Sequence, residues 1–241
     1  MALWRSGVQL PSGPTYAAVV ELADTQVSKT CGLHCPCRFD SDQRHQIFKT
    51  SMAQIDRKIL AYVVGLAIGD GNLSNPNGRA TRLRITCDAK YKNLLFRIIR
   101  SIQTLLPNNK VSIVRRPKNC VDVSCYSNRW ENWLGWKVGN GSKIHQRISV
   151  PQWIKKNRIF TIQCPRGLFE TDGSIYRDRG YWMINFVTMI PDLASDVLSL
   201  VSKIGFKAHF YKTPQNTKLK YTVRVSTDAD RFIKTLSLSK D

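Results

Sequence analysis

The feature that most constrains the fold is an internal repeat, because the second half of the chain copies the first at one constant offset. Along that register identical residues meet and the apolar positions also agree, which chance identity does not produce over so long a stretch. The matched pairs are Gly65 and Gly167, Leu66 and Leu168, Asp70 and Asp172, Gly71 and Gly173, Gly78 and Gly180, Thr86 and Thr188, Lys110 and Lys212, Lys118 and Lys220, Val121 and Val223, Val123 and Val225, and Ser124 and Ser226. The sequence therefore predicts a tandem duplication that aligns without a gap.

Each half has the same order of expected elements, α-β-β-α-β-β-α. Apolar residues at helical spacing predict helices over 54–68, 90–106 and 129–136, and over 157–171, 191–204 and 229–236. Segments of strand type around turns predict strands over 72–75, 82–87, 110–116 and 120–126, and over 174–178, 181–188, 206–213 and 218–227. The first helix of each half ends in Asp-Gly, where we expect glycine to supply the left-handed residue that stops a helix. The predicted fold class is α+β, with a four-stranded antiparallel sheet in each repeat.

The net charge is the most unusual bulk property of the chain. Its 37 Lys and Arg residues against 17 Asp and Glu residues give a formal charge of +20 at pH 7. So large an excess implies a polyanionic partner, and nucleic acid is the commonest one. A solvated basic surface explains a few excess charges but not this number, and an anionic membrane is the weaker alternative.

The location of the protein is indicated by its cysteines and by the lack of export signals. No apolar run approaches the ~20 residues that cross a bilayer, and no signal-peptide pattern opens the chain. The seven cysteines are an odd number, and four of them (Cys87, Cys120, Cys125 and Cys164) stand among apolar positions, as reduced thiols do. We therefore expect an intracellular protein, in the cytoplasm or nucleoid of a bacterium or in an organelle, that is not secreted and has no membrane partner.

Residues 1–51 differ from the rest of the chain. Five basic and four acidic side chains leave them a net charge of +1, and Pro and Gly interrupt any helical or strand period. Two pieces, 8–14 and 18–30, resemble peptides read from transfer-RNA genes. The hypothesis is that 1–51 is an untranslated leader wrongly assigned to the gene, outside the fold, with Met52 as the start. A small metal-binding or targeting arm, with ligands in the cluster Cys31–Cys37, is the alternative.

The remaining chain divides into two repeats and a connection. The first repeat is expected over 52–136 and the second over 157–241. Between them, 137–156 begins with Gly139-Asn-Gly-Ser142 and has the composition of a surface linker.

Two nonapeptides carry the candidate chemistry, Val63-Val-Gly-Leu-Ala-Ile-Gly-Asp-Gly71 and Pro165-Arg-Gly-Leu-Phe-Glu-Thr-Asp-Gly173. Each places a carboxylate at the negative end of a helix dipole, which costs about 0.3–1 kcal/mol. If the two helices pair in parallel, the acids also converge and repel each other. A divalent cation reverses both penalties, and magnesium bound by one or two carboxylates, waters and phosphate oxygens suits phosphodiester hydrolysis.

Both nonapeptides resemble the motif of the LAGLIDADG homing endonucleases, in order and in separation, and the resemblance covers residues 55–236. It implies two halves related by a pseudo-twofold axis, whose sheets form a saddle on double-stranded DNA. It also implies that the two motif helices pack closely through Gly65, Gly69, Gly167 and Thr171. The acids Asp70 and Asp172 would be catalytic and would bind Mg²⁺ or another divalent cation, with Gly69 and Thr171 contributing to the metal site.

Basic residues on or beside the strands are candidates for contact with DNA. Lys118 and Lys220, equivalent in the repeat alignment, precede the last strand of each half, and an amine near the scissile phosphate stabilises developing charge or polarises the attacking water. A lysine that contacts phosphate or is merely solvated is the alternative. Since alternate strand residues share a face, one sheet face is expected to present a basic surface to a major groove. The residues assigned to it are Arg79, Arg82, Arg84, Arg115, Arg116, Tyr176, Arg177, Arg179, Lys212, Lys218 and Arg224.

The predicted function is that of a homing endonuclease, which cuts both strands of a specific DNA site in metal-dependent hydrolysis. Because one chain contains both halves, a monomer suffices, and the diverged halves fit an asymmetric target. The alternative is a binding protein with the same fold, either an intron maturase that holds RNA or a DNA-binding regulator. Loss of one acid would have favoured that alternative, and both acids are present.

Overall fold

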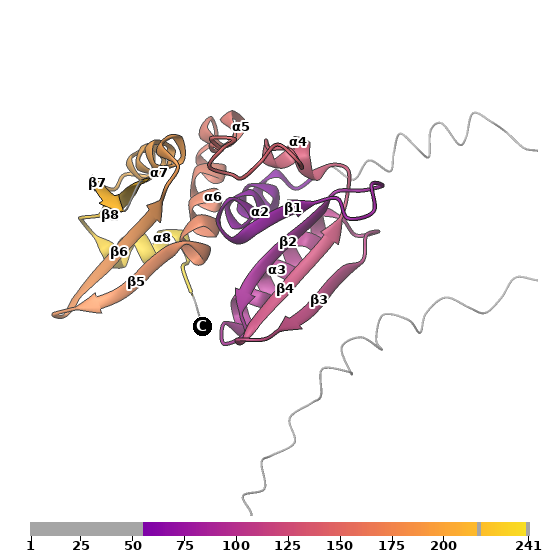
Figure 1. Cartoon of the computed structure of the whole chain (residues 1–241). Helices are drawn as coiled ribbons and strands as arrows, with labels where there is room; N and C mark the ends of the chain where they lie inside the picture. Colours follow the sequence, from indigo (N-terminus) through magenta and orange to yellow (C-terminus); the bar gives the residue numbers. More distant parts are fainter. Residues whose placement is uncertain (1–54, 216–217, 240–241) are drawn as a thin grey trace, which may run out of the picture. The chain divides into compact units, whose positions relative to one another are not determined.

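The structure is a computed structural model that describes residues 55–215 and 218–239 (Figure 1). The first half contains α2 (Arg57–Asp70), β1 (Gly71–Ser74), β2 (Arg82–Asp88), α3 (Lys92–Leu105), β3 (Val111–Arg116), β4 (Cys120–Tyr126) and α4 (Trp130–Leu134). After α5 (Gln152–Lys155), the second half contains α6 (Arg158–Thr171), β5 (Gly173–Asp178), β6 (Tyr181–Thr188), α7 (Pro191–Lys203), β7 (Ala208–Gln215), β8 (Lys218–Val225) and α8 (Ala229–Leu236). The predicted fold class and the repeated order of elements are confirmed. The expected leader and its cysteine cluster lie outside the described residues.

Each half is built on one antiparallel sheet, with the order β1-β2-β4-β3 in the first and β5-β6-β8-β7 in the second. Alternate residues of the central strands are buried on one face, which we call the inner face, as in Leu83 and Ile85 of β2. On this face α3 packs through Leu94, Ile98 and Ile102, the apolar stripe that predicted it. The opposite face of each sheet, the outer face, has no helix on it among the described elements (Figure 1).

Helices α2 and α6 lie side by side between the two sheets (Figure 1). Every residue of α2 from Leu60 to Ile68 is buried, and a helix that is apolar all round belongs inside a protein. Each of the two helices has a side-chain N-cap, because the carboxylate of Asp56 and the amide oxygen of Asn157 accept bonds from the first free backbone N–H groups. No helix in the described part of the chain has the length and hydropathy of a membrane span.

The expected reason for the glycine after each motif acid is wrong. Gly71 has φ −82° and ψ 150°, so it is extended rather than left-handed, and Gly173 is likewise not among the residues with positive φ. Space is the physical reason instead. A Cβ on Gly71 would lie 2.4 Å from the carbonyl oxygen of Ala67, and one on Gly173 would lie 2.4 Å from that of Phe169. Glycine therefore lets the chain turn sharply from helix into strand.

The gap-free repeat alignment is also wrong beyond the first strand of each half. Gly71 pairs with Ile85, whereas Gly173 pairs with Phe186, so the second hairpin is shorter by one residue. In the next strand pair, Val123 opposes Ile85 and Val223 opposes Phe186. Val123 is therefore equivalent to Val223 and not to Val225. By the same register Lys118 corresponds to Lys218 and not to Lys220. The gap-free alignment missed this shift because the loops of the two halves differ in length.

Segment 137–156 is more than the surface linker that its composition indicates. Ile148, Val150 and Ile154 are buried in the core, and the segment contains the short helix α5. The backbone N–H of Val150 donates to the carboxylate of Asp196 at 2.7 Å. Apolar residues without a helical or strand period were enough to anchor this connection.

Candidate active site

The close approach of α2 and α6 rests on two glycines that face each other's backbone. A Cβ on Gly65 would lie 2.1 Å from the carbonyl oxygen of Cys164, and one on Gly167 would lie 2.4 Å from that of Tyr62. Farther along, a Cβ on Gly69 would lie 2.0 Å from the hydroxyl oxygen of Thr171. The helices are thus in backbone contact over this stretch, and their C-terminal ends stay together.

Those ends bring Asp70 and Asp172 into one place. Asp70 is the last residue of α2, and Asp172 caps α6. The carboxyl carbon of Asp172 lies 3.4 Å from the position that a Cβ on Gly69 would take, so it stands against the residue that precedes Asp70. Both acids are exposed, so the C-terminal ends of the paired helices present two carboxylates to solvent.

A lysine from the connection between the repeats lies directly behind the acids. The amine of Lys143 donates to the carbonyl oxygens of Ala67 (2.9 Å), Ile68 (2.7 Å) and Gly69 (2.6 Å), at the C-terminal end of α2. A cation at the negative end of a helix is favourable. Burial lowers the pKa of Lys143 to about 8, while the charges of Asp172 and Asp70 raise it. The amine of Lys143 therefore interacts electrostatically with both carboxylates.

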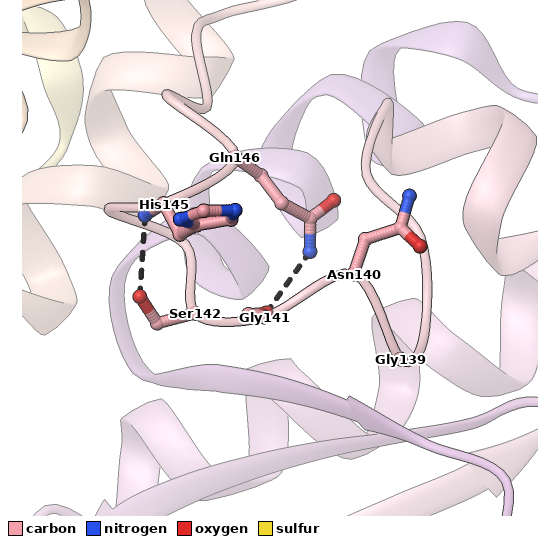
Figure 2. A pocket seen from close by; sticks show the side chains of 6 residues that line it. All are labelled: Gly139, Asn140, Gly141, Ser142, His145 and Gln146. Atoms are coloured by element: carbon pink, nitrogen blue, oxygen red, sulfur yellow. Dashed lines mark hydrogen bonds between the residues drawn. The ribbon is translucent and has the colours of Figure 1, made fainter.

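Sequence reasoning missed Lys143, because it stands in a segment that had the composition of a linker. The loop that carries it is held by Gln146, whose side chain donates to the carbonyl oxygens of Lys137 (2.9 Å) and Gly141 (3.1 Å) and accepts from the N–H of Lys137 (3.0 Å). Figure 2 shows Gln146 reaching across to Gly141, around the shallow hollow that this loop encloses. The glycines at 139 and 141, both with positive φ, allow the tight course of the loop that delivers the lysine.

Asp172 borders a pocket of about 570 Å³ between the helix ends and the second sheet. Its polar lining includes Gly69, Asn72, Lys143, Asp172 and Lys220. Of the two lysines predicted as a symmetric pair, only Lys220 is among the residues that line it. Lys118 lies in the exposed turn between β3 and β4, with φ 65°, as the corrected register explains. The candidate site is therefore asymmetric in its basic groups.

The chain is similar to known proteins in both sequence and structure. Residues 166–236 match the family model described as a LAGLIDADG-like domain. The structure is similar to a mesophilic variant of the homing endonuclease I-DmoI, with a TM-score of 0.57 and 20% identity over 76% of this chain and 98% of that one. It is similar to I-DmoI in complex with DNA and Mn, with a TM-score of 0.55 and 18% identity over 76% and 97% of the two chains.

The chain has the two-repeat LAGLIDADG fold. The resemblance expected from the two nonapeptides is thereby confirmed. The LAGLIDADG fold also occurs in WhiA from Thermatoga maritima, with a TM-score of 0.53 and 12% identity over 76% of this chain and 56% of that one. No curated protein sequence matches the chain.

The donor set at the LAGLIDADG helix ends fits a magnesium ion that keeps most of its water. No cluster of three or more His, Cys, Asp or Glu side chains exists within residues 55–215 and 218–239. Magnesium needs no such cluster, since one or two carboxylates suffice when phosphate and water complete the octahedron. The carbonyl oxygen of Gly69 already accepts from Lys143 and has one lone pair left. The hydroxyl of Thr171 is engaged with the carbonyl oxygens of Gly167 and Leu168.

The strand registers sort the predicted DNA-binding residues by face. Some lie at outer-face positions of the two LAGLIDADG sheets, namely Arg82, Arg84, Arg116, Tyr176, Lys218 and Arg224. Others take inner-face positions and are exposed, namely Arg115, Arg177 and Lys212. Arg79 and Arg179 lie in the hairpin turns. His209 and Tyr211 also lie on the second outer face, and neither was among the predicted DNA-binding residues.

Glu170, two residues before Asp172, belongs to the interface between the repeats and not to the acid site. Its buried carboxylate accepts from the hydroxyl of Tyr62 and pairs with Arg97 at 3.1 Å and Arg166 at 3.2 Å. Burial, and then the charge of Glu170, raises the pKa of Tyr62. Arg97 also donates to the carbonyl oxygen of Ser239 at 2.6 Å. This network stabilises the pairing of the halves that sets the distance between the two acids.

Proposed function

We propose that the protein is a site-specific DNA endonuclease that hydrolyses phosphodiester bonds with the help of a divalent cation. The observation that carries the proposal is the convergence of Asp70 and Asp172 at the paired helix ends, beside Lys143. Two carboxylates at the C-terminal ends of paired helices have no evident value for folding. The position suits a reaction on phosphate, and the fold is shared with I-DmoI, which has been described in complex with its DNA.

Each residue of the site has a definable part in that reaction. Asp70 and Asp172 would bind the cation, which, when present, activates water and stabilises the leaving oxygen. Lys143 would neutralise charge at the carboxylates and at the phosphate that approaches them. Lys220, in the same pocket, would contact the phosphate or the attacking water from the second sheet.

The DNA would lie along the outer faces of the two sheets, where arginines and lysines flank the acids. Because the lysines at the site and the faces of the two halves differ, we infer that the target is asymmetric and that a single chain recognises it. The binding of RNA by a maturase, or of DNA by a regulator, is the second candidate, since the LAGLIDADG fold is also found in WhiA.

One experiment separates these candidates. A randomised duplex library is incubated with the full chain, with magnesium or with EDTA, and the cut molecules are sequenced. The endonuclease predicts double-strand cuts at one sequence in magnesium and none in EDTA. Selection of bound but uncut DNA in both conditions favours the regulator, and tighter binding of intron RNA than of any duplex favours the maturase.

Replacing Lys143 by methionine is expected to lower the cleavage rate by a factor on the order of 10², because one positive charge beside the carboxylates and the reacting phosphate is lost. The exposed Lys137, on the same loop, offers a matched control, and Lys137→Met should cleave as the wild type does. Rates are measured on a linear duplex under single-turnover conditions. The unfolded fraction of the variant is measured by circular dichroism. A cleavage rate that falls only in proportion to this fraction would mean that Lys143 acts only as a cap of α2.

DNA binding is expected to weaken steeply with salt, because lysines and arginines on the outer faces displace counterions from phosphates. A logarithmic plot of the association constant against salt should have a slope of about −4 or steeper. Lys218→Ala, which removes one outer-face amine, should reduce that slope by roughly one. Fluorescence anisotropy with a labelled duplex in EDTA measures the association constant at each salt concentration. An association constant that does not change with salt would exclude binding of the outer faces to phosphates.

A further inference from the structure

The outer face of the first sheet holds a buried carboxylate, which is unexpected on a surface that would meet DNA. Asp122 of β4 is only 5% exposed, and its register places it on the same face as Arg84. An anion here opposes the phosphates instead of attracting them. A buried charge persists only where partners compensate it.

Three side chains from the two neighbouring strands surround Asp122. The hydroxyl of Thr86 on β2 donates to Oδ1 at 2.8 Å, and Nε of Arg116 on β3 donates to Oδ2 at 2.7 Å. The guanidinium of Arg84 on β2 stands 3.9 Å from Oδ2. Burial works to raise the pKa of Asp122, but the bonds from Thr86 and Arg116 and the charges of Arg116 and Arg84 hold it below its ordinary value. The group is therefore ionised at neutral pH.

The contacts leave the arginines able to bind something else. Arg116 uses Nε for Asp122, and within residues 55–215 and 218–239 no hydrogen bond occupies its two terminal nitrogens. About half of its side chain is exposed, at 52%, while Arg84 is more enclosed at 32%. A guanidinium held in this way has lost its rotamer freedom before binding, and its planar fork matches two acceptors on one guanine edge.

The second repeat lacks this arrangement. Thr86 opposes Asp122 in the first sheet, and the equivalent pair in the second sheet is Val187 and Thr222. There is thus no acid at that position, and Arg224 of β8 has the sulfur of Met183 as its hydrogen-bond partner, at 3.2 Å. The difference lies between two strands that the duplication made equal, so it supplies an internal control.

We propose that Asp122 is a positioning residue for sequence recognition: it fixes Arg84 and Arg116 so that the first repeat reads base edges at one end of the target. The inference rests on the proposed function, since it requires that the outer face meets DNA. Without the acid, both arginines are mobile cations that attract phosphates of any sequence. Asp122 therefore lowers the affinity for DNA of any sequence and raises the discrimination between sequences.

The test compares the sequence preference of four full-length proteins, the wild type, Asp122→Asn, Thr222→Asn and Thr86→Val. Asparagine keeps an acceptor for Thr86 but turns an N–H group toward Arg116, and it raises the net charge by one. Bound duplexes are selected from a randomised library in EDTA, so that cleavage plays no part. For Asp122→Asn we expect discrimination at the base pairs of one half-site to fall about tenfold. Affinity for random duplex should rise, and the other half-site should keep its preference.

Thr222→Asn should leave the first half-site unchanged, and Thr86→Val, which removes one hydrogen bond and no charge, should cause a smaller loss of the same kind. An unchanged profile for Asp122→Asn would overturn this inference alone. Equal loss in both half-sites would also overturn it, because that result means general unfolding. A wild type that selects no sequence would overturn the proposed function and this inference with it.

Discussion

Replacing Asp70 or Asp172 by asparagine is expected to lower double-strand cleavage by a factor on the order of 10³ while leaving DNA affinity intact. Asparagine has the same shape as aspartate, so the helix ends should stay paired, but it lacks the charge that holds a divalent cation. The carboxylates repel phosphate when no cation is present. Affinity measured in EDTA should therefore equal or slightly exceed that of the wild type.

The measurement follows both products of a supercoiled plasmid that carries the selected site. Nicked and linear DNA are quantified separately, because loss of one acid affects the coupled cutting of the two strands. Asp230→Asn, at an exposed acid in the first turn of α8, is the matched control and should cut normally. Cutting at full rate by both active-site variants would exclude the two acids from the reaction, and loss of binding along with cutting would make their role structural.

The elements were predictable because their signals are local. The apolar spacing of α3, the alternation of β2 and β4 and the capping residues before α2 and α6 each act over a few neighbouring residues. The two motif acids could be predicted as candidates for the same reason, since each stands at the end of its own helix. Their convergence depends on the glycines at 65 and 167, which leave room for the backbone of the other helix.

What the sequence concealed depends on contacts between distant segments. Lys143 reaches the end of α2 from a segment without any regular period, so no spacing rule connects it with Asp70. The shift in register arises in a hairpin turn, where one residue more or less leaves the strand patterns intact. The contacts of Asp122 could not be predicted from the sequence, because its hydrogen-bond partner Arg116 lies on the neighbouring strand.

Adding a single methyl group at the helix crossing tests whether this fold depends on backbone contact. In an isolated helix, Gly65→Ala or Gly167→Ala would stabilise by about 1 kcal/mol. Here each new Cβ would lie 2.1 or 2.4 Å from a carbonyl oxygen of the other helix, and backbone has no rotamer with which to move away. We expect either substitution to lower the free energy of unfolding by about 3 kcal/mol, through forced separation of α2 and α6.

The substitution Gly69→Ala provides the graded comparison, since its Cβ would meet the side chain of Thr171. In a Thr171→Gly background the obstacle is gone, so a double-mutant cycle should show that Gly69→Ala costs much less there than in the wild type. Urea unfolding gives the free energies, and cleavage is measured where each variant is folded. Because Asp70 ends α2 and Asp172 caps α6, Gly65→Ala and Gly167→Ala should also slow cleavage in the folded protein. Stability equal to that of the wild type in both variants would contradict the close packing on which the geometry of the two acids depends.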